Sequence, residues 1–281
     1  MDQQHLQQWI GRSEQRADRI SQSTVAAMAA TLDRDRFDVR TGVDVPPLWH
    51  WAFFIPSTPA REIGPDGHAK RGDFLPPVPL PRRMWAGGRL VFHHPLRVDD
   101  AITRTSRIAN VESKEGRTGP LVFVTVQHEI ANANGVAITE EHDIVYRENP
   151  RPDAAPVPLQ SAPEGAQFTR QIAPDPVLLF RYSALTFNGH RIHYDRPYVT
   201  EVEGYPGLIV HGPLIATFLL ELLTATLPAE RVHRFSFKAV RPVFDLHRFD
   251  VCGRREGERG VALWARDHDG ALAMQANAEL A

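Results

Sequence analysis

The chain repeats one pattern, as RLVFHHPLRVDD at residues 89–100 and as RFSFKAVRPVFD at residues 234–245. Phe92 in the first stretch matches Phe237 in the second, at an offset of 145 residues (92 to 237). The turns that follow also correspond, EGR with EGER and then ANANG with DHDG. Self-similarity at a fixed spacing indicates a duplicated structural unit. The sequence therefore predicts two copies of one fold.

Each copy has the pattern of helix followed by antiparallel sheet. An Ala-rich run after Ser and Thr capping candidates predicts a helix at 21–32 in the first half. In the second half, Asp175 and Pro176 open a predicted helix that runs to residue 185, and a strongly apolar helix is predicted at 213–227. Runs rich in Val, Ile, Thr and Phe predict strands. These runs are 84–93, 101–115, 121–133 and 136–147 in the first half, and 168–172, 232–243, 249–255, 261–267 and 271–279 in the second.

The segments between these elements divide the chain. The aromatic run PPLWHWAFFIP at 46–56 is bracketed by prolines, which favours an extended segment. Residues 61–81 hold many Gly, Pro and charged residues and are predicted to form a long loop. A Pro- and Ala-rich linker at 151–167 is the expected domain boundary. We therefore predict an α+β protein with an N-terminal unit at 1–150 and a C-terminal unit at 151–281.

Composition argues against several classes of protein. The chain has 281 residues, 42% of them hydrophobic, and a net charge of −2, which gives no case for nucleic-acid or membrane binding. Its longest apolar stretch, 208–223, is interrupted by His, Gly, Pro and Glu, so it is not expected to span a bilayer. Cys252 is the single cysteine, and the N-terminal residues lack the pattern of a secretory signal. The expected compartment is the cytoplasm.

The second half contains a segment that the first half lacks, LTFNGHRIHYD at residues 185–195. A duplicated scaffold needs both cores but only one active site, so this unrepeated polar segment is the candidate site. Its histidines are candidate acid–base groups, because histidine titrates near neutral pH, although a histidine in a loop is often only a structural residue. The His-x-x-His-x-Asp spacing would also suit a metal ion, but the segment lacks the helical context that would place both imidazoles on one face. We expect no metal here.

The segment resembles the motif of the MaoC-like, (R)-specific enoyl-CoA hydratases, aromatic-x-x-S/T-G-D-x-N-P-x-H, followed by an H-G pair that opens a long helix. His193 falls on the catalytic histidine, and His211-Gly212 falls on the H-G pair, with Gly212 lying 19 residues after His193. The variant FNGHRIHYD and the aromatic run at 46–56 are closer still to mesaconyl-, 3-methylfumaryl- and itaconyl-CoA hydratases and mitochondrial 3-hydroxyacyl thioester dehydratases. The resemblance covers most of the chain. It implies a double hotdog, in which each sheet wraps around a central helix.

This sequence departs from the common motif at two positions. Asn188 stands where the motif has its catalytic aspartate, and His190 stands where it has asparagine. Members with the common motif are thought to use the aspartate and the histidine together on one water. Because an amide cannot accept a proton, His193 is the expected base, and Asn188 is expected to orient water or substrate. The candidate for a second titrating group is His190 or Asp195.

Other residues complete the expected site. Free backbone N–H groups at Gly212, where a helix begins, suit the enolate oxygen of a thioester. Tyr182 and His211 are expected to support the catalytic groups. Three side chains of the first half are candidates for lining the acyl pocket, with core packing as the alternative: Trp49, His50 and Trp51. Three basic residues are candidates for binding substrate or the phosphates of coenzyme A, with ordinary surface charge as the alternative: Arg191, Lys238 and Arg241.

The resemblance implies a hydratase or dehydratase that adds water to, or removes it from, an acyl-CoA thioester. Arginines near the motif (Arg181, Arg191 and Arg196) favour a short dicarboxylic acyl group, such as mesaconyl, itaconyl or 3-methylfumaryl. No cofactor is expected beyond the coenzyme A of the substrate. Three alternatives stay open: a dehydratase of 3-hydroxyacyl chains on acyl carrier protein, a hotdog thioesterase, and a non-catalytic acyl-CoA-binding module. The resemblance also implies a homodimer, although a double hotdog already places two hotdog units in one chain.

Overall fold

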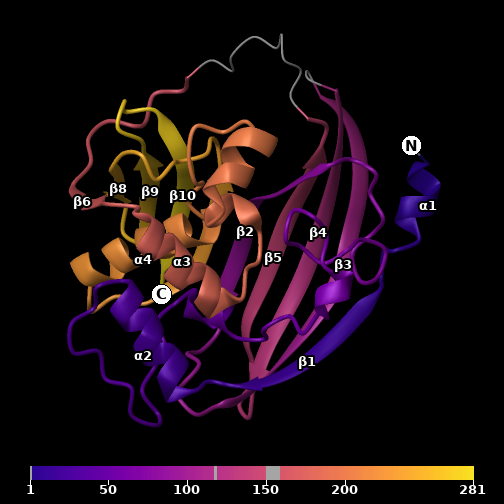
Figure 1. Ribbon diagram of the computed structural model, residues 1–281. Coiled ribbons are helices and arrows are strands. Elements are labelled where there is room, and N and C mark those ends of the chain that lie inside the picture. Colours follow the sequence, from indigo (N-terminus) through magenta and orange to yellow (C-terminus); the bar gives the residue numbers. More distant parts are fainter. Residues whose placement is uncertain (1, 117–118, 150–158) are drawn as a thin grey trace.

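The computed structural model describes residues 2–116, 119–149 and 159–281. Its ten strands form one antiparallel sheet in the order β1-β3-β4-β5-β2-β7-β10-β9-β8-β6 (Figure 1). The strands of the first half are β1 Ser13–Arg19, β2 Arg82–Phe92, β3 Ala101–Gly116, β4 Gly119–Asn132 and β5 Gly135–Arg147. Those of the second half are β6 Phe168–Ile172, β7 Val232–Ala239, β8 Phe249–Glu256, β9 Gly260–Arg266 and β10 Leu272–Leu280. All nine predicted strands, β2 to β10, are confirmed.

The sheet repeats itself about its middle. Each half, from its outer edge inward, places its first, third, fourth, fifth and second strands in that order, and the two second strands, β2 and β7, pair at the centre. In this central pair Leu90 lies opposite Phe235, an offset of 145 residues (90 to 235). Phe92 and Phe237 match at the same offset, so the sequence repeat coincides with the symmetry of the sheet. The predicted α+β double hotdog is confirmed.

Four α-helices accompany the sheet, and three of them gather beside the second half (Figure 1). They are α1 Gln3–Gln7, α2 Gln22–Thr31, α3 Pro176–Thr186 and α4 Gly212–Thr226. α4 is buried along most of its length and packs on β6, β8, β9 and β10, which makes it the central helix of the second hotdog. Among the described residues, no helix combines the length and the apolar character that crossing a membrane requires.

The first half covers its sheet differently. Between β1 and β2 it has α2 and two short 3-10 helices, Trp49–Ala52 and Ala60–Glu62, and none of these is as long as α4. Part of the long strands β3, β4 and β5 is covered instead by Val78 and Leu80 of the predicted long loop, together with Leu6 of α1. The loop is therefore a packed element of the fold, although it has little regular structure.

Three local features differ from the sequence-based expectations. The run at 46–56 is not extended throughout, because Trp49–Ala52 forms a turn of 3-10 helix. Of the α-helices and strands, α1 and β1 were not predicted. β1 has the sequence SEQRADR, whose only apolar residue is alanine, and it is an edge strand with exposed or half-buried side chains. Part of the expected linker, residues 150–158, lies outside the described residues.

A buried ion pair fastens the first half to α4. Glu221 of α4 is buried and pairs with Arg34, which follows α2. The other oxygen of the Glu221 carboxylate accepts a hydrogen bond from Trp49 Nε1 at 2.9 Å. Trp49 is only 1% exposed, so its contacts are those of a core residue at the junction between the halves.

We expect Glu221→Ala to lower the free energy of unfolding by about 3 kcal/mol, because the substitution leaves the Arg34 guanidinium and the Trp49 indole N–H without their partner. The measurement is urea unfolding followed by circular dichroism. Glu201→Ala, which removes an exposed carboxylate, is the matched control and should leave the midpoint unchanged. An unfolding midpoint of Glu221→Ala equal to that of wild type would contradict this account of the junction.

Candidate active site

The histidine motif lies on the irregular segment between α3 and α4. α3 ends at Thr186, and Phe187 follows in the left-handed conformation (φ 50°) that turns the chain away from the helix axis. The Asn188 backbone N–H then donates to the Ser183 carbonyl at 2.8 Å. The Asn188 side-chain oxygen accepts from the His190 backbone N–H at 3.0 Å. One acceptor of Asn188 therefore shapes the loop, and its side-chain NH2 group is what remains for a water or a substrate.

His193 has the hydrogen-bonding state of a neutral base. It ends the 3-10 helix Arg191–His193 and is buried. Its Nδ1–H donates to the Ile209 carbonyl at 2.7 Å, so the proton resides on Nδ1 and the lone pair on Nε2. Burial lowers the pKa of His193 to about 4, although the hydrogen bond to Ile209 opposes this. At neutral pH the ring is uncharged, and Nε2 is able to accept a proton.

His211 brings the start of α4 against this base. Its ring stacks on that of His193 with centroids 3.7 Å apart, and its Nε2 is 2.8 Å from Ser183 Oγ. Burial holds the pKa of His211 well below its ordinary value. The Tyr182 ring meets His211 edge-on at 5.0 Å. His211 therefore covers one face of the base with a buried, uncharged ring, and Tyr182 packs against His211.

Gly212 is the first residue of α4. The helix has no side-chain N-cap, so the first N–H groups of α4 carry no capping side chain. A Cβ placed on Gly212 would find only Met274 Cε within 4 Å, at 4.0 Å. The Gly212 N–H is thus available to a hydrogen-bond acceptor, and there is space beside its Cα. Gly212 directly follows His211, whose ring stacks on that of His193.

A loop of the first half docks on the motif backbone to backbone. The Arg191 N–H donates to the Asp66 carbonyl at 2.9 Å. Gly67 has φ +90° and lies so close to Gly189 that a Cβ on Gly67 would be 1.8 Å from the Gly189 carbonyl oxygen. Only glycine satisfies both conditions at residue 67. The site is therefore built by both halves of the chain.

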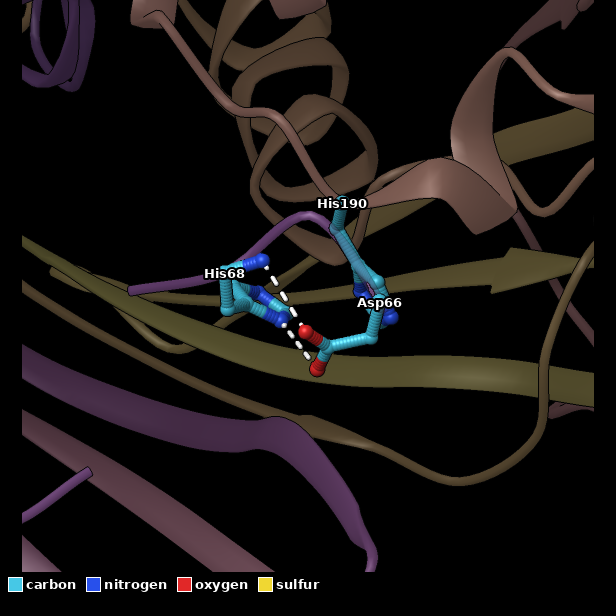
Figure 2. A group of neighbouring side chains, drawn as sticks. All are labelled: Asp66, His68 and His190. Carbon is cyan, nitrogen blue, oxygen red and sulfur yellow. Dashed lines mark hydrogen bonds and ion pairs between the residues drawn. The ribbon is translucent and has the colours of Figure 1, made fainter. Parts of the chain in front are cut away.

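This contact brings Asp66 and His68 beside His190 (Figure 2). The Asp66 carboxylate accepts two hydrogen bonds at 3.0 Å, one from the His68 backbone N–H and one from His68 Nδ1. The rings of His68 and His190 have centroids 4.1 Å apart, and those of His190 and His193 are 5.5 Å apart. One potential ligand atom from each of Asp66, His68 and His190 lies within 4.8 Å of the others, so these three are the residues here that could hold a small ligand or a metal ion.

The charge states of this group follow from burial. Burial would raise the pKa of Asp66, but the hydrogen bonds and charge of His68 outweigh it and hold this pKa well below its ordinary value. Burial lowers the pKa of His68 to about 4, assisted by the Arg83 guanidinium and opposed by Asp66. Burial also lowers the pKa of His190 to about 2, with a further contribution from His68. At neutral pH the carboxylate is ionised and both imidazoles are uncharged.

Two other residues of the motif bind one another. Arg191 Nε donates to Asp195 Oδ2 at 2.9 Å, and Arg191 Nη1 donates to the Pro65 carbonyl at 3.0 Å. Asp195 Oδ1 accepts from the Tyr198 N–H at 3.1 Å. Arg191 thus ties the motif to the first-half loop, and Asp195 fixes the start of the segment after it. Of the two candidates for a second titrating group, Asp195 is paired with Arg191, and the centroid of the His190 ring lies 5.5 Å from that of His193.

The aromatic run of the first half contacts a buried carboxylate. Glu140 is 2% exposed and accepts hydrogen bonds from His50 Nε2 at 3.0 Å, from Trp51 Nε1 at 2.7 Å, and from His142 Nε2. The Trp51 ring also meets the Trp85 ring edge-on at 4.9 Å. His50 and Trp51 therefore belong to a polar and aromatic cluster on the inner face of the first-half sheet.

The two basic candidates other than Arg191 lie outside the histidine motif. Lys238 is exposed on β7, and Arg241 is half-buried. Arg241 pairs with Asp267 at 2.7 Å and borders a hollow of about 250 Å3 that also includes Phe244 and His247. Within the described part of the chain, neither side chain forms a hydrogen bond or ion pair with the histidine motif.

Sequence reasoning missed the carboxylates of these clusters, Asp66 and Glu140, and two of their histidines, His68 and His142. Asp66 and His68 lie in a loop without periodicity, more than 120 residues before His190, and no sequence signal pairs them. Glu140 could have been predicted from the sequence, because strand alternation places it on the same face as buried Ile138. A carboxylate at an inward position of a strand indicates a buried polar site.

The double hotdog and its histidine motif define a class of protein, the MaoC-like hydratases and dehydratases. HtdX of Mycobacterium tuberculosis has the same fold, with a TM-score of 0.69 at 22% identity, covering 96% of this chain and all of that one. A MaoC-like dehydratase from Phytophthora capsici gives a TM-score of 0.73 at 14% identity, covering 100% and 99% of the two chains.

The chain belongs to the hydroxyacyl-thioester dehydratase type 2 family, whose profile matches residues 48–245. It is 48% identical over 272 residues to a Chloroflexus aurantiacus protein named mesaconyl-C(4)-CoA hydratase, which covers 97% of this chain and 96% of the relative. It is 27% identical over 248 residues to the mitochondrial hydroxyacyl-thioester dehydratase type 2 of Schizosaccharomyces pombe, covering 79% and 82% of the two chains. The resemblance inferred from the motif is confirmed.

We expect Gly67→Ala to displace the first-half loop from the motif, because the new Cβ would overlap the Gly189 carbonyl. Hydrogen–deuterium exchange should show faster exchange across residues 188–195, where the Arg191 N–H loses its acceptor. Gly72→Ala is the control, since Gly72 has φ +105° in the same loop but its Cβ would meet nothing closer than 3.7 Å. Equal protection of 188–195 in the two variants would show that the docking contact is unimportant.

Proposed function

We propose that this protein is a hydratase of coenzyme A thioesters that acts on a short dicarboxylic enoyl group of the mesaconyl type, and catalyses the reverse dehydration at the same site. The observation that supports the proposal is that His193 is buried and neutral, with its lone pair on Nε2. Its ring stacks on that of His211, the residue before α4. The identity of 48% to a protein named mesaconyl-C(4)-CoA hydratase supports the substrate class.

Hydration of the enoyl thioester follows from these groups. His193 Nε2 takes a proton from water as the water oxygen attacks Cβ, and electron density moves to the thioester oxygen. The Gly212 N–H stabilises that oxygen at the positive end of α4, since the following residue, Pro213, has no N–H to contribute. His193 then returns the proton to Cα, so one molecule of water is added. Asn188 directs its side-chain NH2 group to the water or to the substrate.

The two halves have different parts in this proposal. Residues 151–281 form the catalytic unit, which holds His193 and α4. Residues 1–150 form the unit that lines the acyl pocket, with His50 and Trp51 on its inner face. Lys238 and Arg241 are proposed contacts for the phosphates of coenzyme A, since both are basic and lie at the surface of the second half.

The proposal also covers the cofactor requirement, the compartment, the assembly and the group that carries the acyl chain. The enzyme is proposed to need no cofactor, because His193 and the helix start supply the acid–base and electrostatic groups of the reaction. A free, buried Cys252 fits a reducing cytoplasm, and a homodimer is the proposed assembly. The second candidate function is dehydration of 3-hydroxyacyl chains on acyl carrier protein, favoured by the identity of 27% to the mitochondrial dehydratase.

We expect His193→Asn to lower kcat about 10²–10⁴-fold, the usual contribution of a general base. Asparagine can still donate to the Ile209 carbonyl but has no basic nitrogen in place of Nε2. His93→Asn, at an exposed histidine, is the matched control and should retain full activity. In the wild type, the acid limb of kcat/KM should lie near pH 4 rather than near 6.5, because the lowered pKa keeps His193 unprotonated as the pH falls. An acid limb at the ordinary histidine value would contradict the assigned state of this residue.

Substrate class is tested with a panel of enoyl thioesters, following loss of conjugated absorbance and release of free thiol together. We expect absorbance loss without thiol release, with a higher kcat/KM for mesaconyl-CoA than for crotonyl-CoA, which lacks the distal carboxylate. Thiol release would identify a thioesterase. Turnover only on acyl carrier protein substrates would favour the second candidate function.

A further inference from the structure

The motif lacks the carboxylate that would share the water with its histidine. Asn188 occupies that position, and its side-chain oxygen already accepts the His190 backbone N–H. When His193 takes a proton from water it becomes positively charged inside a buried site, and such a charge needs a compensating negative charge nearby. Among the other motif residues, the Asp195 carboxylate is paired with Arg191. The negative charge must therefore come from outside the motif.

The first half of the chain supplies a negative charge, the Asp66 carboxylate, beside the histidine motif. Asp66 is held beside His190 by the backbone contact of its loop with the motif, and its carboxylate is bound to His68 Nδ1 at 3.0 Å. Since the Asp66 carboxylate accepts the proton of Nδ1, His68 carries its lone pair on Nε2. Two guanidinium groups, Arg71 and Arg83, also lie within electrostatic range of His68 and oppose its protonation. The ionised carboxylate is thus the negative member of an otherwise neutral or positive group.

The group reaches His193 through its rings. One potential ligand atom from each of Asp66, His68 and His190 lies within 4.8 Å of the others, and Asp66 Oδ2 is hydrogen-bonded to His68 Nδ1 at 3.0 Å. The ring centroids of His68 and His190 are 4.1 Å apart, and those of His190 and His193 are 5.5 Å apart. A row of two imidazoles therefore connects the carboxylate to the base.

We propose that Asp66, acting through His68 and His190, supplies the negative charge that this motif lacks at Asn188. Asp66 and His68 are positioning residues: they fix the tautomer of the imidazole that faces His190 and offset the charge that His193 acquires during turnover. The water O–H bond breaks toward His193 Nε2, the oxygen bonds to Cβ, and the same proton later reaches Cα. Asp66, His68 and His190 return unchanged. This inference rests on the proposed hydratase function.

The decisive variant is Asp66→Asn. Asparagine keeps the oxygen that accepts the His68 backbone N–H, so the turn of the loop is preserved, whereas the negative charge and the acceptor of the His68 Nδ1–H are lost. We expect kcat to fall about 10²-fold with KM changed less than about threefold, as for loss of an interaction made in the transition state. His68→Gln should give a similar loss, and the double variant should be no slower than either single one. Glu62→Gln, at an exposed carboxylate of the same loop, should retain full activity.

Relocating the charge separates this role from a structural one. In the Asp66→Asn background, Asn188→Asp restores a carboxylate at the position of the common motif and should recover at least tenfold of the lost kcat. A merely structural Asp66 would give no recovery, and that result would overturn the inference. Full activity of Asp66→Asn alongside an inactive His193→Asn would also overturn it while leaving the hydratase function intact. An inactive wild type would instead reject the proposed function itself.

A metal ion is the alternative ligand for Asp66, His68 and His190. The wild type should keep its activity after dialysis against a chelator and should show no stoichiometric zinc by elemental analysis. Loss of activity with the chelator, restored by zinc and dependent on Asp66, would replace the charge-compensation role with a metal site.

Discussion

The pairing of β2 with β7 is the constraint on which the molecule depends. It joins two five-stranded sheets into one, with Leu90 opposite Phe235, and so fixes where every element of one half meets the other. A continuous backbone ladder leaves no freedom for the halves to slide, since a shift of one residue would turn every side chain to the other face. This rigidity allows a loop of the first half to contact the motif of the second half closely. At the Gly67–Gly189 contact the two backbones are so near that there is no room for a Cβ on Gly67.

Duplication leaves one copy free to change. The second half keeps a long buried helix, α4, and its start carries His211 and Gly212. The first half has no such helix among its described residues, and its chain between β1 and β2 has two other roles. One part, including Val78 and Leu80, covers the sheet. Another part bears Asp66 and the residues that dock on the motif. The two halves therefore differ in function because different segments cover their sheets: a long helix covers the second half, and irregular chain covers much of the first.

Much of this architecture was predictable because it is periodic. Strand alternation, turn residues and the 145-residue offset are local patterns, and they correctly placed nine strands, α2, α3 and α4. β1 was missed because an edge strand such as SEQRADR buries too little to show an apolar pattern. His193 was found as part of a contiguous motif, and so was His190. Asp66 and His68 could not be found, since only the assembled sheet brings a loop without periodicity to residues more than 120 positions away.

The charges of the site follow from its burial more than from its composition. Four imidazoles, those of His68, His190, His193 and His211, form a row with ring centroids 4.1, 5.5 and 3.7 Å apart. Protonated rings at these distances would repel one another in a medium that screens poorly, so burial and mutual repulsion keep all four neutral at rest. A neutral row has lone pairs available, which is what a base needs, but it offers no stabilisation for the proton that the base receives. One ionised carboxylate at the end of the row supplies that stabilisation without protonating any ring beforehand.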